Sequence, residues 1–153
     1  MREPNTILIA RDLMTTNLLV FHPGQSIVDA IQSLIKRGVS GAPVVDDRNT
    51  LLGVLSEIDC LRMFASDDFC IQQQQEGATV AKYMSTGGRT VPPDLGIYAV
   101  AHYFLTSPIR RIPVVERGKL LGQISRRDVL RGMEEMTRQR MPRKRYPDYR
   151  SPA

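Results

Sequence analysis

The chain has 153 residues, of which 42% are hydrophobic and 24% are charged, and its formal net charge is +5. A chain of this length and composition forms one ordinary domain, or two small lobes that share a core. A membrane-spanning helix is excluded, because no apolar run approaches the roughly eighteen residues that a span needs. The first residues lack the apolar core of a signal peptide, and the two cysteines, Cys60 and Cys70, fit neither a metal site nor a disulfide framework. We therefore expect a cytoplasmic protein.

In the first half of the chain, signals for a strand, a helix, a hairpin and a second helix follow one another. An apolar, β-favouring stretch at 18–21 precedes Ser26, which suits a helix cap, and Gly38, which suits a helix end. The helix between them has an apolar face with helical spacing, formed by Ile27, Ala30, Ile31, Leu34 and Ile35. A hairpin then follows, with strands at 42–45 and 51–55. The second helix starts at Ser56, and its apolar positions include Ile58, Leu61 and Met63.

The second half of the chain repeats this order. Its predicted elements are a short strand, a helix, the two strands of a hairpin and a closing helix, at 90–91, 97–105, 112–115, 120–124 and 125–133. Pro43-Val44-Val45, for example, returns as Pro113-Val114-Val115. Each half alone would bury too little surface to be comfortably stable. We therefore predict an α/β (α+β) fold in which two pseudo-symmetric β-α-β-β-α repeats pack face to face as one body.

Two segments fall outside the repeats. Residues 64–80 join them, and the sequence leaves open whether this linker is helix or loop. We expect residues 138–153 to form a disordered tail, because residues 138–150 alone carry a net charge of +5 and residues 142–153 contain three prolines. This tail could bind nucleic acid, a membrane surface or an acidic partner. The alternative, which we favour, is a solvated segment that aids solubility.

Each hairpin leads into the same motif: a glycine, the rest of a strand, and Ser-x-x-Asp at the start of a helix. The two copies run from Gly53 to Asp59 and from Gly122 to Asp128. A helix N-terminus offers free N–H groups and a partial positive charge, both of which favour a phosphate. The carboxylate can accept two hydrogen bonds from ribose hydroxyls. Ser-x-x-Asp is also an ordinary helix cap, but its repetition in register shifts the balance toward a nucleotide.

With these residues in place, the chain resembles a tandem cystathionine-β-synthase (CBS) domain pair, or Bateman module. The resemblance covers roughly residues 10–133, with repeats at 10–65 and 81–133. It is carried by the two Ser-x-x-Asp motifs and by Asp12-Leu13-Met14-Thr15, Gly38 to Asp46, Lys82-Tyr83-Met84-Ser85 and Arg111 to Val115. It implies CBS repeats packed sheet to sheet, a homodimer formed through the helices, and a regulatory module with no catalysis of its own. The implied ligand is adenosyl: AMP, ADP, ATP or S-adenosylmethionine, signalling to a partner protein by a change of shape.

The resemblance also places that ligand in two clefts between the repeats. One cleft would use Ser125, Arg127 and Asp128, with a base side lined by Val20, Val39, Ser40, Gly41 and Pro43. The other would use Ser56 and Asp59, with a base side lined by Val91, Ile109, Arg110 and Arg111. We favour the Asp128 cleft for occupancy, because its base side at Ser40-Gly41 is small and open.

Several arginines depart from the pattern of the family. Arg110 and Arg111 stand where many members have a small residue, and they could bind a polyphosphate, fill the cleft or face solvent. Arg126 and Arg127 lie at a helix N-terminus, where cations are unfavourable; a bound anion would relieve this, unless the side chains simply point into water. The sequence contains no catalytic constellation and no metal-ligand spacing, so we predict neither site. A structural dimer with empty clefts, or a nucleic-acid-binding protein that uses the tail, are the alternatives.

Overall fold

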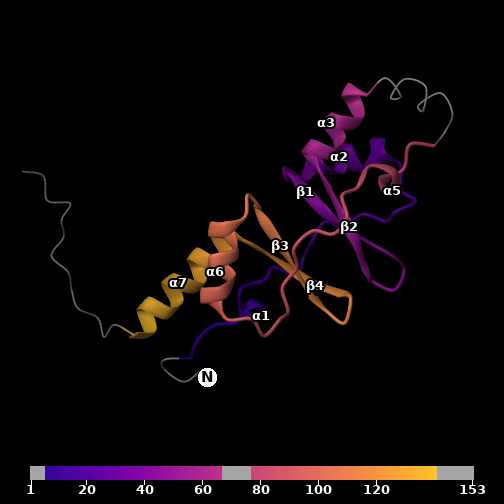
Figure 1. Ribbon diagram of the computed structural model, residues 1–153. Helices are drawn as coiled ribbons and strands as arrows, with labels where there is room; N and C mark the ends of the chain where they lie inside the picture. The colour runs from indigo at the N-terminus through magenta and orange to yellow at the C-terminus, as the bar shows by residue number, and fades with distance from the viewer. Residues whose placement is uncertain (1–5, 67–76, 141–153) are drawn as a thin grey trace, which may run out of the picture.

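The elements of the first half recur in the second half in the same order. In the computed structural model, which describes residues 6–66 and 77–140, the first repeat contains α2, β1, β2 and α3, and the second contains α6, β3, β4 and α7 (Figure 1). Short helices, α1 and α5, precede the repeats. The bounds are α1 Ala10–Leu13, α2 Ile27–Arg37, β1 Gly41–Val45, β2 Leu51–Ser56, α3 Glu57–Ala65, α5 Val80–Tyr83, α6 Ile97–Thr106, β3 Arg111–Glu116, β4 Lys119–Ser125 and α7 Arg126–Arg140.

Local signals set both ends of helix α2. The Ser26 hydroxyl accepts a hydrogen bond from the N–H of Asp29 (3.5 Å), as an N-cap side chain does. At the other end, Gly38 adopts the left-handed conformation with φ at 64° and donates its N–H to the carbonyls of Leu34 and Ile35. Both ends of this helix were therefore predicted from the sequence.

The expected first strand of each repeat is a single bridge. Phe21 pairs parallel with Val44 of β1, and Val91 pairs parallel with Val114 of β3. A proline follows within two residues in both places, and proline has no N–H with which to extend a ladder. A parallel bridge beside the antiparallel hairpins β1–β2 and β3–β4 makes each sheet mixed.

The segment that precedes each repeat packs on the other repeat. Helix α1 contacts α6, α7 and β4, and Thr15 pairs antiparallel with Gln123 of β4. In the same way α5 contacts α3, and Ser85 pairs antiparallel with Val54 of β2. Figure 1 places α1 beside the second repeat and α5 beside the first. Because each repeat takes a segment from the other half, the two fold as one body, as their small size predicts.

Each repeat has its own apolar core, completed by the exchanged segment. The first core contains Phe21, Ile27, Ala30, Leu34, Ala42, Val44, Leu55, Met63 and, from α5, Val80. The second contains Val91, Ile97, Val100, Ile112, Val114, Ile124, Val129, Met136 and, from the N-terminal segment, Leu8, Ala10 and Leu13. The sheets meet at their hairpins, where the N–H of Leu51 bonds the carbonyl of Gly118 (3.0 Å) and that of Leu120 bonds the carbonyl of Asn49 (3.1 Å).

The helices differ from the sequence expectation in three ways. Ile35 does not join the buried face of α2: it is 75% exposed, because it lies at the edge of the stripe set by Ile27, Ala30 and Leu34. Of the apolar residues predicted in α3, Met63 is buried, whereas Ile58 and Leu61 are exposed. The closing helix continues past residue 133 to Arg140, because Met136 still packs in the second core.

Parts of two predictions lie outside the described residues. These are residues 67–76 of the linker and residues 141–153 of the basic tail. The described ends of the linker are helical on one side, to Ala65, and enter α5 at Val80 on the other. Residues 138–140, which were expected to begin the tail, belong to α7. Within 6–66 and 77–140, the helices are too short or too polar to cross a membrane.

Candidate ligand-binding clefts

A cleft of about 630 Å³ opens between the repeats beside the start of α3. We call it the larger cleft. Strands β1 and β2, the first turn of α3, residues 85–90 and the approach to β3 form its walls. Its lining includes Ser40, Pro43, Leu51, Val54, Ser56, Glu57, Ile58, Leu61, Ser85, Gly87, Gly88, Arg89, Ile109, Arg110 and Arg111. Apolar walls with a few polar groups are typical of sites for small organic ligands.

A second cleft, of about 300 Å³, lies beside the start of α7. We call it the smaller cleft. It is lined by Thr15, Asn17, Leu18, Leu19, Arg37, Val39, Gly41, Arg111, Gln123, Ser125, Arg127, Asp128 and Arg131. Gly41, Arg111 and Gln123 also line the larger cleft, so the two clefts adjoin.

The Ser-x-x-Asp motif of the first repeat forms a capping box at the start of α3. One carboxylate oxygen of Asp59 accepts hydrogen bonds from the N–H (2.9 Å) and the hydroxyl (3.0 Å) of Ser56. The other oxygen accepts a bond from the hydroxyl of Ser85 (2.7 Å), which comes from the exchanged segment. The side chain of Asp59 is buried and does not itself line the larger cleft; Ser56 and Ser85 do. The helix-cap interpretation of the motif is therefore realised in the structure.

The second repeat has the same arrangement. Asp128 accepts bonds from the N–H (2.8 Å) and the hydroxyl (3.0 Å) of Ser125. Its other oxygen accepts a bond from the Thr15 hydroxyl (3.4 Å) and pairs with the Arg131 guanidinium (3.2 Å). Thr15 is the repeat equivalent of Ser85, so each motif aspartate is bonded by a hydroxyl from the exchanged segment. Unlike Asp59, Asp128 lines its cleft directly.

The glycine of each motif is required by close packing. An added Cβ at Gly53 would lie 2.5 Å from the carbonyl oxygen of Ser85, and one at Gly122 would lie 2.7 Å from that of Thr15. These distances are too short for any side chain. The motif therefore combines three structural tasks: close approach of the exchanged segment at the glycine, capping at the serine, and bonding of that segment at the aspartate.

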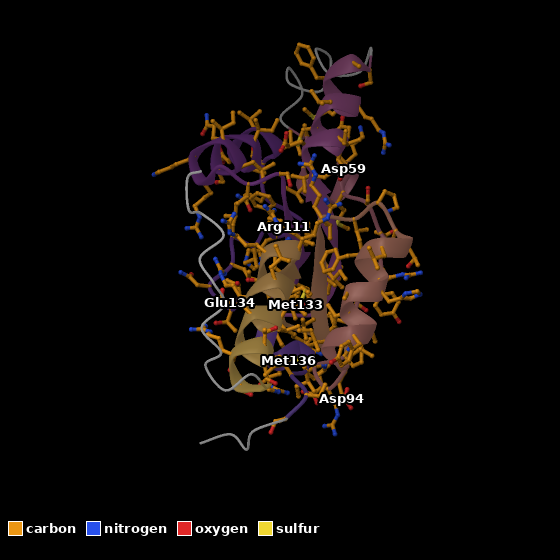
Figure 2. The ribbon with its side chains drawn as sticks, turned by 90° about the vertical axis from the view of Figure 1, so that its left-hand side faces the viewer. Asp59, Asp94, Arg111, Met133, Glu134 and Met136 are labelled. Carbon is orange, nitrogen blue, oxygen red and sulfur yellow. The ribbon has the colours of Figure 1, made fainter. Side chains whose placement is uncertain are left out.

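Arg111 lies at the junction of the two repeats (Figure 2). Its guanidinium donates a hydrogen bond to the carbonyl of Gly41 (2.9 Å), the equivalent position of the other repeat. The expectation that the base side of the Asp128 cleft is open at Ser40-Gly41 is therefore wrong. An arginine from the opposite repeat lies at this position and bonds the Gly41 carbonyl.

The structure brings together most of the predicted site residues. Those predicted for the Asp59 cleft that line the larger cleft are Ser56, Ile109, Arg110 and Arg111. Those predicted for the Asp128 cleft that line the smaller cleft are Val39, Gly41, Ser125, Arg127 and Asp128.

The structure places five other predicted residues outside the lining of their predicted cleft; one of them is the buried Asp59, described above. Ser40 and Pro43 line the larger cleft instead of the smaller one, because the Ser40 carbonyl accepts the first N–H of α3 (2.9 Å) and Pro43 pairs with Val54. Val91 lines neither cleft, because its bridge to β3 buries it in the second core. Val20 also lines neither cleft.

Sequence reasoning missed several residues of the clefts. Thr15 and Ser85 are seventy residues apart, which is the spacing of other equivalent residues in the two repeats. Aligning the two halves would therefore have indicated that these two hydroxyls have equivalent roles. Arg37 and Arg131 approach the smaller cleft from α2 and α7, and only the tertiary fold brings them together. Arg89 lines the larger cleft, and its guanidinium lies 4.6 Å from the centre of the ring of Tyr103, which packs against the second core.

Comparison with known proteins also identifies two repeats in this chain. The family model described as the CBS domain matches twice, at residues 10–66 and 80–135. A curated relative is the chloroplastic CBS domain-containing protein CBSX2 of Arabidopsis thaliana, 30% identical over 153 residues, which cover 84% of this chain and 64% of that protein. Another is the uncharacterised protein MJ1225 of Methanocaldococcus jannaschii, 26% identical over 79% of this chain and 41% of that protein. The chain thus spans less than two thirds of the length of these relatives.

Solved structures have the same fold. The crystal structure of CBSX2 in complex with AMP has a TM-score of 0.75 and 32% identity, and the match covers 85% of this chain and 98% of that chain. The protein AcuB of Vibrio cholerae has a TM-score of 0.77 at 23% identity, over 90% of this chain and 100% of that chain. The CBS domain pair of protein MJ0100, in complex with 5′-methylthioadenosine and S-adenosyl-L-methionine, has a TM-score of 0.64 at 22% identity. At such identities, the last two likenesses concern the fold alone.

Proposed function

This chain belongs to the CBS domain family as a tandem pair, and we propose that it is a regulatory module that binds an adenosyl ligand in the larger cleft. The ligand of the related CBSX2 complex is AMP, and that of a more distant domain pair is S-adenosyl-L-methionine with 5′-methylthioadenosine. These ligands share an adenosine group. The observation that carries the proposal is a cleft of about 630 Å³ between the repeats, within the range of roughly 300–1,000 Å³ of small-molecule sites.

The chemistry of the larger cleft suits the parts of such a ligand. Ile58, Leu61 and Ile109 offer apolar surface to a base, and the first turn of α3 presents the Ser56 hydroxyl. Arg89 and the neighbouring Arg110 and Arg111 supply positive charge for a phosphate or a carboxylate. This assignment differs from the sequence preference for the Asp128 cleft, because the smaller cleft has half the volume and Arg111 occupies its base side.

Asp59 is the proposed acceptor for the ribose. Its outer oxygen already accepts the hydroxyl of Ser85 at 2.7 Å, and this is the bond that a ribose hydroxyl imitates. We infer that the ligand takes over this acceptor and moves the Ser85 hydroxyl aside. Since Ser85 belongs to the segment that joins the repeats, ligand binding is then coupled to the packing of that segment on β2. A ligand shifts a conformational equilibrium only by its difference in affinity for the two shapes.

The exposed faces of the helices support a homodimer as the signalling form. Large apolar side chains outside the clefts are more than half exposed on α3, α6 and α7: Phe64, Tyr98, Leu105, Leu130 and Met133. Exposed apolar surface of this kind marks protein interfaces. Leu130→Asp is expected to convert the dimer to a monomer in size-exclusion chromatography with light scattering. A monomeric wild-type protein at the same concentration would contradict the homodimer.

The proposal is tested with a matched pair of variants, Asp59→Asn and Asp128→Asn. Both substitutions change the same position of a capping box, so their cost to stability is similar and only their cleft differs. AMP or S-adenosylmethionine at a hundred times its dissociation constant stabilises the wild type by about 2.7 kcal/mol, which raises Tm by about 5–10 °C. We expect Asp128→Asn to keep this shift and Asp59→Asn to lose most of it. The proposal is abandoned if no adenosyl ligand shifts the wild type, or if both variants respond alike.

A further inference from the structure

The smaller cleft has an unusual charge balance. Four arginines line it, from three different elements: Arg37 at the end of α2, Arg111 at the start of β3, and Arg127 and Arg131 in the first turns of α7. The one carboxylate in its lining is Asp128. The cleft therefore has a formal excess of three positive charges in a volume of about 300 Å³.

Asp128 forms an ion pair with only one of these four arginines. Its two oxygens accept bonds from the Ser125 N–H and hydroxyl and from Thr15, and its ion pair at 3.2 Å is with Arg131. Arg111 donates to a backbone carbonyl rather than to an acid. Arg37 and Arg127 form no ion pair with the described residues. Arg37, Arg111 and Arg127 thus line one cleft without a carboxylate partner among the described residues. Like charges gathered in one cleft disfavour each other unless an anion lies between them.

We propose that the smaller cleft binds a phosphate chain, such as pyrophosphate, and not a second nucleoside. Guanidinium groups present paired N–H donors that match the oxygens of phosphate groups. The N-terminus of the fifteen-residue helix α7 adds a partial positive charge at the same wall. A base has little room here, because Arg111 reaches across to Gly41. The proposal goes beyond the adenosyl site of the larger cleft; it rests on that proposed function only where the phosphate chain is the tail of a nucleotide.

The phosphate chain has two possible sources. It is either free pyrophosphate or the phosphate tail of a nucleotide whose base lies in the larger cleft. Arg111 and Gln123 line both clefts, so a tail that passes Arg111 enters the group of arginines. Both sources present linked phosphate groups to the arginines. Comparing the binding of pyrophosphate, AMP and ATP distinguishes the free chain from the nucleotide tail.

Calorimetric titration of inorganic pyrophosphate into the full chain tests the proposal. The variants are Arg37→Gln and Arg127→Gln, and the matched control is Arg126→Gln. Arg126, like Arg127, is exposed and belongs to the same helix turn, but it donates to the Ile109 carbonyl (3.5 Å) and lines neither cleft. We expect the wild type and the control to bind pyrophosphate, with affinity that falls as salt is added. Each of the other two variants is expected to bind at least about tenfold more weakly, as for the loss of one charge-assisted bond. Thermal melting without ligand verifies that all variants fold.

The outcomes separate this site from the larger cleft. Pyrophosphate binding that is weakened by Arg127→Gln, while the AMP response is kept, supports a site for the free chain. If Arg127→Gln weakens ATP but not AMP, and free pyrophosphate does not bind, the phosphate-chain site stands with the nucleotide tail as its source. The proposal is overturned if neither pyrophosphate nor ATP binding distinguishes Arg127→Gln from Arg126→Gln. It is also overturned if Asp59→Asn, and not Arg127→Gln, abolishes the pyrophosphate response.

Discussion

Replacing Gly53 by alanine should destabilise the protein even when no ligand is present. The new Cβ would lie 2.5 Å from the Ser85 carbonyl oxygen and 3.2 Å from the Met84 sulfur. The sulfur can move, but the carbonyl cannot easily do so, because Ser85 exchanges two backbone hydrogen bonds of 2.9 Å with Val54. The clash therefore either breaks this bridge or displaces the exchanged segment. Overpacking of this kind costs about 1–3 kcal/mol, which for a chain of this size lowers Tm by about 2–12 °C.

Urea unfolding followed by circular dichroism measures this cost as a change in midpoint at constant slope. Gly122→Ala, whose Cβ would meet the Thr15 carbonyl at 2.7 Å, should lose a similar amount. Gly24→Ala is the control, because nothing lies within 4 Å of its added Cβ; its free energy of unfolding should stay within about 0.5 kcal/mol of the wild type. A midpoint for Gly53→Ala equal to that of Gly24→Ala would refute the close-packing explanation of the motif glycine.

Two further predictions concern the caps and the thiol. Ser56→Ala and Ser125→Ala each remove a capping hydroxyl and should each lower the free energy of unfolding by about 1 kcal/mol in urea; no loss at either position would contradict the capping boxes. Burial, and then the negative charge of Asp59, raises the pKa of the Cys60 thiol. In a Cys70→Ser variant, the alkylation rate should therefore rise with a midpoint above the ordinary value of 9.0, and a lower midpoint would be inconsistent with this burial. Because the folded state holds the proton more tightly, this contribution to stability is present below the unfolded-state pKa and is lost as pH rises through the folded-state pKa.

The sequence predicted the fold well where local patterns and the repeat agreed. Ser26 and Gly38 mark helix α2 in the sequence, and the hairpins follow from alternating apolar stretches around turns. The exchange of α1 and α5 between the repeats was not predicted, because nothing in a local pattern tells which core receives a short apolar helix. The true end of α7 was missed for the same reason: Met136 is held in the helix by its contact with the second core.

The site was predicted less completely than the fold. The two Ser-x-x-Asp motifs were found, and both lie at the clefts as helix caps. Their partners Thr15 and Ser85 come from the opposite repeat, so only the alignment of the halves could have indicated them. The group of arginines around the smaller cleft depends on the relative placement of α2, β3 and α7, which the sequence does not reveal.

The difference between the two clefts can be traced to one pair of equivalent positions. Residues 41 and 111 correspond in the two repeats and face each other, since the Arg111 guanidinium bonds the Gly41 carbonyl. Two arginines here would place like charges together, and two glycines would leave both clefts equally open. A side chain at residue 41 also has little room, because its Cβ would lie 3.1 Å from the Leu55 carbonyl oxygen. Glycine on one side and arginine on the other therefore break the symmetry of the duplicated fold in the lining that the two clefts share.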